Sequence, residues 1–290
     1  MFDATSPSEA RSATPPGANL VDGRAEIVFV CDGARTRLAH LYQHEPLRVL
    51  FPAAPAEDCL QAALVTTSGG LVGGDRLAVD IRAGRGASAL ISPQAAEKVY
   101  RSTGAECRIH VSLAGEAGSW LEWLPQETIL FEGARLRRST IIEAAAEARV
   151  FAGEMLVFGR VGRGERFSRG LVRDAWDVRR AGALVWADAL LLSDDTAAAL
   201  AHPAGFDGAV ACATAIYVAP DAGQRLADAR RALGDPAEVR CGATLVNGIV
   251  VARFLSRRPL ALRDAFGAFW KSFRHAVAGL PPVLPRLWHV

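Results

Sequence analysis

The chain has 290 residues, of which 50% are hydrophobic and 22% are charged, and this is enough apolar material for a folded core. Its 33 basic and 31 acidic side chains leave a formal net charge of +2. This near-balance argues against a nucleic-acid-binding protein, which normally carries a concentrated basic excess. No run of about 18 apolar residues is present, so no span of a membrane is expected. The five cysteines form no CxxC pair and no secretory signal is visible, which indicates reduced thiols in the cytoplasm.

The first 19 residues contain mainly Ser, Pro, Thr and Ala, which offer little to bury, and they are predicted to form a disordered tail over 1–19. The remainder shows no internal repeat and no further linker, so a single domain is predicted over 20–290. Short apolar runs alternate with polar residues through the first two-thirds of this domain, and period-2 runs between glycine turns predict β-strands. The runs are 25–30, 77–81, 109–113, 121–124, 136–150, 150–159, 166–177 and 183–192. The segment 83–87 is predicted to join two of them as a hairpin.

Helices are expected in three places. The segment 94–101 predicts a short helix, and 221–233 has helix-forming composition followed by Gly234 and Pro236 as a stop. The run 259–277 predicts a strong amphipathic helix. Its apolar face is formed by Leu262, Phe266, Phe269, Trp270, Phe273 and Val277. Packing of this face against the sheet is favoured over a dedicated partner-binding role.

The glycine-rich segment TTSGGLVGGDR (66–76) was tested first as a phosphate-binding loop. Gly69 and Gly74 have the required separation, but Asp75 and Arg76 stand where the template needs a lysine and a hydroxyl. An aspartate there would repel phosphates. The glycines are therefore predicted to permit positive φ and close backbone approach in a tight turn between strands.

Other chemical signatures are weak. The segment 84–89 matches GxGxxA, but a strand-like run follows it where a nucleotide-binding unit needs a helix. His40 and His44 are four residues apart, yet their surroundings predict a strand and loop rather than a chelating helix. No GxSxG nucleophile motif is present.

Two dense segments carry the remaining candidates. Residues 119–133 (SWLEWLPQETILFEG) are interpreted either as a core strand with Trp120 and Trp123 on opposite sides, or as a polar rim at an interface. Residues 94–101 contain Lys98, one of only two lysines, which hints at a need for a compact ammonium but also fits a solvated face.

Five ordered blocks together resemble the urease accessory protein UreD family, called UreH in some bacteria. They are SGGLVGGDRL (68–77), QAAEKVYRS (94–102), LEWLPQETILFEGA (121–134), GEMLVFGRVGRGERF (153–167) and PRLW (285–288). The segment TRLAHLYQHEPLRVLFP (36–52) is similar as well. The resemblance covers the chain from about residue 20 to its end. It implies a mainly β fold, an elongated stack of β-sheets with two helices in the C-terminal third.

The same resemblance implies a maturation factor without catalytic activity of its own. Members bind the urease apoprotein and UreF, which recruits the GTPase UreG, and together they bring nickel into urease. Nickel would be a transient cargo, with no tightly bound cofactor, and no nucleic acid or membrane is implied as a partner. The alternative is an all-β small-molecule enzyme of unknown type, and a third interpretation is an interaction protein without a role in metal passage.

A conduit must bind its ion loosely, so carboxylates suit nickel passage better than Cys and His clusters. We expect some of the carboxylates in the family-like blocks to line a polar passage: Asp75, Glu127, Glu132, Glu154 and Glu165. Each of them could equally be a structural partner of an arginine. The motif or interface candidates are Gly73, Gly74, Gln94, Lys98, Tyr100, Arg101, Trp123, Pro125, Gln126, Phe131, Gly159 and Arg160.

Overall fold

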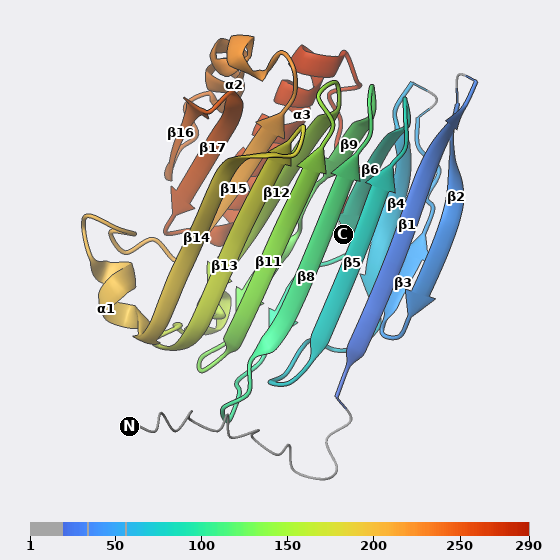
Figure 1. Cartoon of the computed structure of the whole chain (residues 1–290). Helices are drawn as coiled ribbons and strands as arrows, with labels where there is room; N and C mark the ends of the chain where they lie inside the picture. Colours follow the sequence, from blue (N-terminus) through green and yellow to red (C-terminus); the bar gives the residue numbers. More distant parts are fainter. Residues whose placement is uncertain (1–19, 34, 56, 290) are drawn as a thin grey trace, which may run out of the picture.

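Two large β-sheets face each other and form most of the molecule (Figure 1). The computed structural model describes residues 20–33, 35–55 and 57–289, so the tail predicted over 1–19 lies outside the described residues. The mainly β architecture predicted from the alternating sequence, and implied by the family resemblance, is confirmed.

Among the described residues, no helix or second sheet covers the outer face of the seven-stranded sheet (Figure 1). Its strands, in spatial order, are β14 (Ala183–Asp195), β13 (Arg169–Arg180), β11 (Arg135–Ala144), β8 (Cys107–Gly115), β5 (Arg76–Ala83), β1 (Asp22–Asp32) and β2 (Arg35–His44). Its strands alternate buried and exposed side chains, as expected for a sheet with one solvated face.

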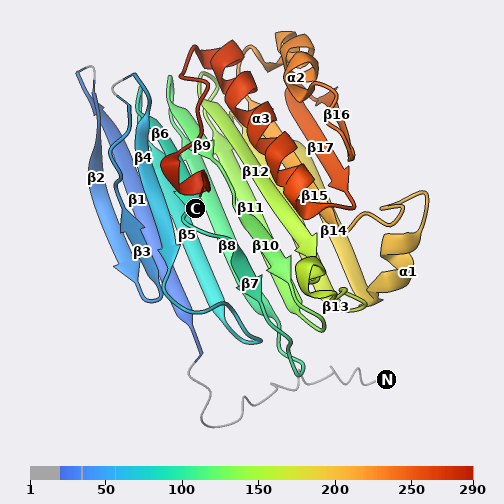
Figure 2. The same cartoon turned by 180° about the vertical axis from the view of Figure 1, so that it is seen from behind.

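The ten-stranded sheet lies behind it (Figure 2). Its main path runs through β16 (Val239–Val246), β17 (Ile249–Ser256), β15 (Ala211–Val218), β12 (Arg149–Phe158), β9 (Trp120–Trp123), β6 (Ser88–Pro93), β4 (Leu60–Thr66) and β3 (Leu47–Leu50). Two short strands branch from this path: β10 (Glu127–Leu130), which pairs with β12, and β7 (Glu97–Val99), which pairs with β10.

The central part of the chain winds as a solenoid. Along the strands β5, β6, β8, β9, β11, β12 and β13 it alternates between the seven-stranded and the ten-stranded sheet. Successive strands within each sheet are consequently parallel, because every return requires a crossing through the opposite layer. The hairpin predicted over 83–87 is wrong for this reason: the segment carries the chain from β5 in one sheet to β6 in the other. Period-2 alternation identifies strands but does not say which sheet each one joins.

Two hydrophobic cores hold the layers together. One lies between the sheets and includes Val79, Ile81, Leu113 and Ile142. The other lies on the far side of the ten-stranded sheet, where α3 (Pro259–Ala278) crosses β12 and β15 (Figure 2). Because both faces of β12 are covered, nine of its ten residues are buried.

The predicted C-terminal helices are confirmed with small changes. The predicted apolar face of α3 is buried, Pro259 opens the helix, and Gly279 closes it in the left-handed conformation at φ 66°. Helix α2 (Leu226–Leu233) falls inside the predicted 221–233, preceded by a 3-10 turn at Ala222–Gln224. A third helix in the described chain, α1 (Thr196–Ala201), was not predicted, because six residues are too few to show a helical period. Further 3-10 turns lie at Val161–Arg163 and Arg286–His289.

The helix predicted over 94–101 is wrong. This segment contains β7, which pairs with β10, and its flanking amides are also held in extended pairing: Gln94 N donates to Leu64 O and Tyr100 N donates to Leu71 O. Tertiary pairing overrides the helical propensity of the alanine and charged residues here.

The glycine-rich turn between β4 and β5 is confirmed. Gly70 and Gly74 have positive φ values of 134° and 100°. A Cβ at Gly73 would lie 2.2 Å from Ser102 Oγ, so that position requires close approach rather than an unusual φ. Gly69 has neither property, and its predicted role is not supported. No helix in the described part of the chain is long and apolar enough to cross a membrane.

Candidate functional site

A cluster of three buried charges lies between the two sheets. Arg138 on β11 and Asp174 on β13 occupy paired positions on neighbouring strands, and Glu154 reaches them from β12 in the opposite sheet. Arg138 Nε and Nη2 lie 2.8 Å and 2.9 Å from the Asp174 carboxylate oxygens. Arg138 Nη1 lies 2.6 Å from Glu154 Oε2, and the two side chains are only 3% and 5% exposed. One guanidinium is thus shared by two carboxylates.

Two further side chains complete the polar contacts of this cluster. Trp123 Nε1 donates to Glu154 Oε1 at 3.2 Å, and Arg138 Nη1 donates to Thr128 Oγ1 at 3.1 Å. Burial away from water raises the pKa of the Glu154 carboxyl, whereas the neighbouring Arg138 opposes that rise. With both carboxylates ionised the cluster carries one formal negative charge in excess.

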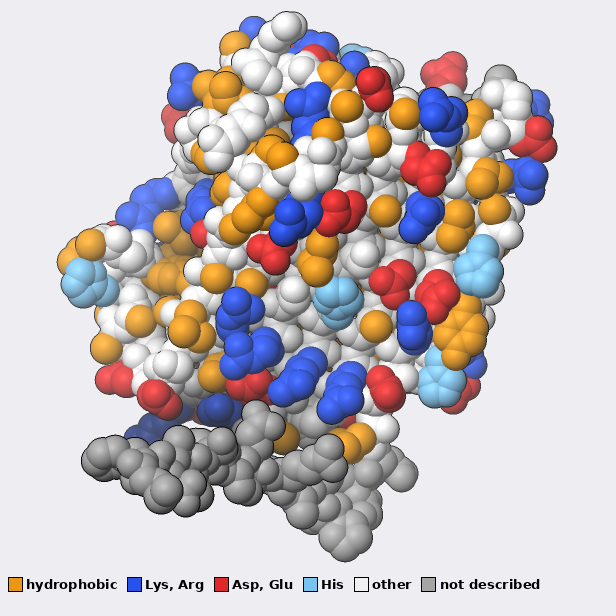
Figure 3. All heavy atoms as spheres, in the orientation of Figure 1, with side chains coloured by type: hydrophobic (Ala, Val, Ile, Leu, Met, Phe, Trp, Pro, Cys, Tyr) orange, Lys and Arg blue, Asp and Glu red, His pale blue; other side chains and the backbone are white. Residues whose placement is uncertain are grey.

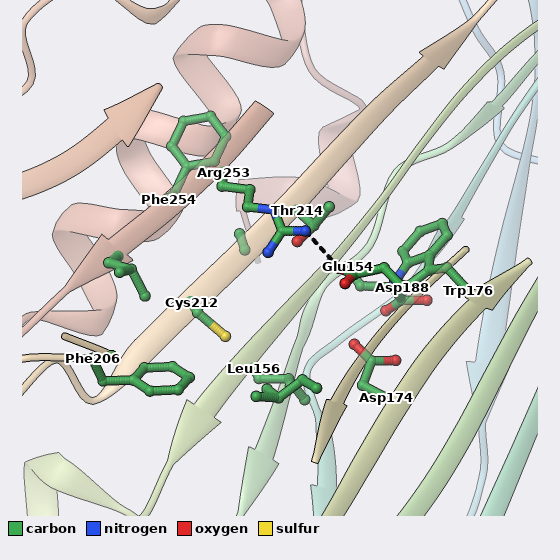
Figure 4. A pocket seen from close by; sticks show the side chains of 14 residues that line it. Glu154, Leu156, Asp174, Trp176, Asp188, Phe206, Cys212, Thr214, Arg253 and Phe254 are labelled. Carbon is green, nitrogen blue, oxygen red and sulfur yellow. Dashed lines mark hydrogen bonds and ion pairs between the residues drawn. The ribbon is translucent and has the colours of Figure 1, made fainter. Parts of the chain in front are cut away.

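A cavity of about 260 Å³ adjoins the cluster, between β13 and β14 on one side and β15 and β17 on the other (Figure 4). Glu154, Asp174 and Cys212 line it, and at its far side Arg253 Nη2 lies 2.7 Å from Asp188 Oδ2. Burial, followed by the nearby Asp174 charge, raises the pKa of the Cys212 thiol to about 12. The thiol therefore stays protonated at neutral pH and is a poor metal ligand.

Two smaller cavities share lining residues with their neighbours, the second between the sheets and the third beside β4, β7 and the glycine-rich turn. The second, about 60 Å³, shares Glu154 with the first and is also lined by Arg138. The third, about 190 Å³, shares Thr66 and Glu97 with the second and reaches the glycine-rich turn. Each neighbouring pair of cavities thus shares a carboxylate in its lining: Glu154 for the first two, and the partly buried Glu97 for the second and third.

Glu97 is the carboxylate shared by the second and third cavities. Its Oε2 accepts a hydrogen bond of 2.8 Å from Thr66 Oγ1, and burial raises its pKa. Lys98, next to it, is exposed and lines the outer end of the third cavity. Among the described residues, no group of three or more His, Cys, Asp or Glu side chains is placed to hold a metal ion. The carboxylates are spaced along the interior rather than gathered at one point.

Comparison with known families identifies the chain. A family profile described as UreD urease accessory protein matches residues 21–289. The chain belongs to the UreD family of urease accessory proteins. The "Urease accessory protein UreD" of Magnetococcus marinus is 43% identical over 274 residues, covering 93% of this chain and 94% of the relative. The protein of the same name from Xanthobacter autotrophicus is 41% identical over 286 residues, covering 99% and 96% of the two chains.

The UreD-like sequence blocks meet at one end of the molecule. The rings of Tyr100 and Phe131 pack edge to face with centroids 4.7 Å apart, and the Arg160 guanidinium lies 4.4 Å from the Phe131 centroid. Tyr100 Oη donates to Gly69 O at 2.9 Å. A Cβ at Gly133 would lie 3.0 Å from Arg101 Cγ. Four blocks that are far apart in the sequence thus share one small packing unit around β7 and β10.

The other motif candidates of this UreD member have varied surroundings. Gln126 Nε2 donates to Leu287 O at 3.2 Å, which ties the LPQET block to the C-terminal PRLW. Gly159 has φ 92°, and a Cβ there would lie 2.5 Å from Glu165 O, so the position requires glycine. Trp120 and Trp123 belong to different hydrophobic cores, which confirms that they face opposite sides of β9. Five of the motif candidates line the second or third cavity: Trp123, Pro125, Gln126, Gln94 and Lys98.

The structure does not bring the five predicted passage carboxylates together. Glu154 is the one among them that lines the cavities between the sheets. Asp75 accepts hydrogen bonds from Val21 N at 2.9 Å and Val72 N at 2.8 Å, so it fixes the glycine-rich turn.

The other three carboxylates also have local partners. Glu127 Oε2 lies 3.2 Å from Arg263 Nη1 of α3. Glu132 accepts from Ser168 N and Oγ, each at 2.6 Å. Glu165 Oε1 accepts from Glu132 N at 2.7 Å, and its other oxygen pairs with Arg160. Their part in metal passage stays a prediction, and the geometry favours Glu154 over the rest.

Four residues of this region were not among the predicted site residues: Arg138, Asp174, Glu97 and Cys212. A usable signal was present for the first two. Leu136, Arg138 and Ile142 share the inward side of β11, and Val172 and Asp174 share that of β13. A charged residue at an inward position of a period-2 strand predicts a buried charge.

Proposed function

We propose that this chain is a non-enzymatic urease maturation factor of the cytoplasm that binds the urease apoprotein. Together with UreF and the GTPase UreG it enables nickel to enter the urease active site. Membership of the UreD family supports the maturation role, and the names of its relatives tie that family to urease. The partners follow from the family resemblance.

The observation that carries the nickel part of this proposal is the sharing of Arg138 by Glu154 and Asp174 beside the first two cavities. When Glu154 is ionised, the two buried carboxylates and one guanidinium carry one excess negative charge. Burial raises the pKa of Glu154 to about 7, so at neutral pH this charge is partly present, and an approaching cation favours the ionised form. Because both carboxylates are already bonded to Arg138, a divalent ion gains only part of their coordination. The cation is attracted but not trapped, as a conduit requires.

The protonated Cys212 thiol supports the same conclusion. A thiolate at this point would bind nickel tightly, whereas a thiol whose pKa is raised to about 12 must lose a proton before it can coordinate. Nickel is a cargo in this proposal and not a resident cofactor. The alternative of an all-β enzyme gains nothing from this arrangement, because the two buried carboxylates are committed to Arg138.

The test is nickel loading of apo-urease in a reconstituted mixture of this chain, UreF, UreG, GTP, bicarbonate and nickel. Glu154→Gln removes the excess charge and keeps an oxygen to accept from Trp123. We expect severalfold less nickel per urease at early times, with complex formation unchanged by size-exclusion chromatography. Glu143→Gln is the matched control, because Glu143 is 51% exposed on β11.

Two outcomes contradict separate parts of the proposal. If Glu154→Gln loads nickel normally in an intact complex, nickel does not pass between the sheets, and the maturation role still stands. If the wild-type chain neither binds UreF nor promotes nickel loading, the proposed maturation role is contradicted.

A further inference from the structure

Four arginines form a row across the exposed face of the seven-stranded sheet. Arg76 on β5 is paired in register with Arg108 on β8, which is paired with Arg137 on β11, which is paired with Arg173 on β13. Adjacent strands are about 4.8 Å apart, so each guanidinium has another within reach on the next strand. Basic side chains gather in a band across the lower part of this face (Figure 3).

Two carboxylates adjoin the arginine row, as we call these four residues: Asp22 on β1 is the register partner of Arg76, and Glu106 lies beside Arg137. Arg137 is paired with Glu106, with Nε 2.8 Å from Oε2. No described carboxylate forms an ion pair with Arg76, Arg108 or Arg173. Like charges directly opposite on neighbouring strands destabilise a sheet. Three of the four arginines therefore lie beside like charges without an ion-pair partner among the described residues.

More basic residues lie just before the row along the same strands, with Arg135 two residues before Arg137 and Arg169 four residues before Arg173. Arg101, Arg135 and Arg169 line an open hollow of about 680 Å³, together with Asp194 and Asp195. Arg135 Nε is buried with no hydrogen-bond partner among the described residues. Arg135 forms no ion pair with a described residue and thus adds positive charge beside the row.

The row is narrow, and this decides what kind of anion fits it. Two residues further along the strands stand Ala78, His110, Ser139 and Ala175, and four residues along, Asp80 on β5 and Asp177 on β13 reverse the charge. A nucleic-acid backbone would extend past the row and meet these carboxylates. A protein surface with a single narrow acidic stripe could contact the arginines without meeting Asp80 and Asp177.

The row consists of arginines, and this also favours carboxylates as the groups that it binds on a partner. Arginine presents a planar fork that bonds a carboxylate through two nitrogens, which lysine does not. The basic residues of this chain are nearly all arginine, and the pair of Arg137 with Glu106 already shows such a two-nitrogen contact on this surface.

We propose that the arginine row is the docking surface for an acidic stripe on a partner protein. The inference rests on the proposed function for the choice of partners to test, and it adds the face of the molecule and the chemistry of the contact. It is independent of the route that nickel takes, because the row lies on the outer face and the cavities lie between the sheets.

The test reverses two charges of the row in the full chain, Arg76→Glu with Arg173→Glu. The matched control is Arg82→Glu with Arg179→Glu, six residues further along the same two strands and on the same face. Each chain is titrated by surface plasmon resonance on immobilised apo-urease and, separately, on immobilised UreF, in low and high salt. Circular dichroism and thermal unfolding show whether both variants are folded.

We expect the row variant to bind one of the two proteins at least about tenfold more weakly in low salt, with a smaller loss in high salt because screening already weakens the wild-type contact. The control variant should bind within about twofold of wild type in the same assay. Equal binding of wild type and row variant to both proteins would overturn the inference and leave the proposed function standing. A wild-type chain that binds neither protein would overturn both.

Two further experiments test whether the arginine row instead binds nucleic acid or acidic residues of its own chain. A row-dependent affinity for duplex DNA, with protein binding unaffected, would replace the acidic protein by nucleic acid. The chain's own acidic residues before position 20 are tested with Asp3→Asn and Glu9→Gln in the full chain. If these changes abolish the effect of the row variant, the row is covered by its own chain and the inference is overturned.

Discussion

Arg274 of α3 and Glu122 of β9 form an ion pair in which neither side chain is accessible to solvent, with Nη2 2.9 Å from Oε1. Trp120 Nε1 and Trp270 Nε1 also donate to this carboxylate, at 2.8 Å and 2.7 Å. A second carboxylate, Asp58, lies 2.5 Å from Arg274 Nη2. This group fastens α3 to the outer face of the ten-stranded sheet, beside the aromatic core and away from the cavities.

Removal of Arg274 should be strongly destabilising. Arg274→Ala leaves Glu122 and Asp58 buried without their cation, and breaking one side of a buried ion pair costs about 3–5 kcal/mol. We expect this loss in the free energy of urea unfolding. Arg231→Ala on α2 is the control, because its side chain is 76% exposed and should change stability by less than about 0.5 kcal/mol. Similar values for the two variants would contradict a structural role for the pair.

Two glycines of the same turn should respond differently to a methyl group. A Cβ at Gly73 would lie 2.2 Å from Ser102 Oγ and 2.6 Å from Ala105 O, whereas nothing lies within 4 Å of one at Gly69. Gly73→Ala should therefore cost about 1–3 kcal/mol. Gly69→Ala should be neutral or stabilising by up to about 1 kcal/mol, because alanine restricts the unfolded chain. Melting temperatures of the two variants, compared in one buffer, decide the matter, and equal losses would refute the steric argument.

Much of the fold could be predicted from the sequence because the signals are local. Alternation on β5 and β8 and the apolar face of α3 each lie within a dozen or so residues. The crossing between sheets at 83–87 and the pairing of β7 with β10 depend on segments far away in the chain. Local periodicity carries no information about such partners, and the two segments were predicted as a hairpin and a helix instead.

The candidate site was predictable only in part for the same reason. Glu154 was found because it lies in a family-like block, but its partners Arg138 and Asp174 come from strands outside those blocks. The arginine row depends on the register of four strands, and register is a property of the assembled sheet. A net charge of +2 gave no sign of it, because a total conceals where the charges gather.

Asp75 should prove structural. Asp75→Ala leaves the amides of Val21 and Val72 without their acceptor, which should cost about 1–3 kcal/mol per buried group left unsatisfied. Nickel loading per folded molecule should be unchanged, because Asp75 does not line the cavities between the sheets. Loading measured at equal concentrations of folded chain checks this, beside Glu154→Gln. A fall in nickel loading without a fall in stability would instead support the earlier prediction that Asp75 lines the nickel passage.

Glu106 should make a pH-dependent contribution to stability through Arg137. The hydrogen bonds from Arg137 lower the pKa of the Glu106 carboxyl, so the folded state favours its ionised form. The contribution is therefore fully present above the unfolded pKa of about 4.3 and is lost as the pH falls through the lower, folded value. Because Arg137 is 40% exposed, we expect less than about 1 kcal/mol. Urea unfolding from pH 7 to pH 3 should show Glu106→Gln less stable than wild type at pH 7 and equal to it at the acidic end. The difference at pH 7 should also shrink in about 1 M salt, where charges are screened within about 3 Å. A difference that grew on acidification would show that the Arg137 contact does not stabilise the ionised carboxylate.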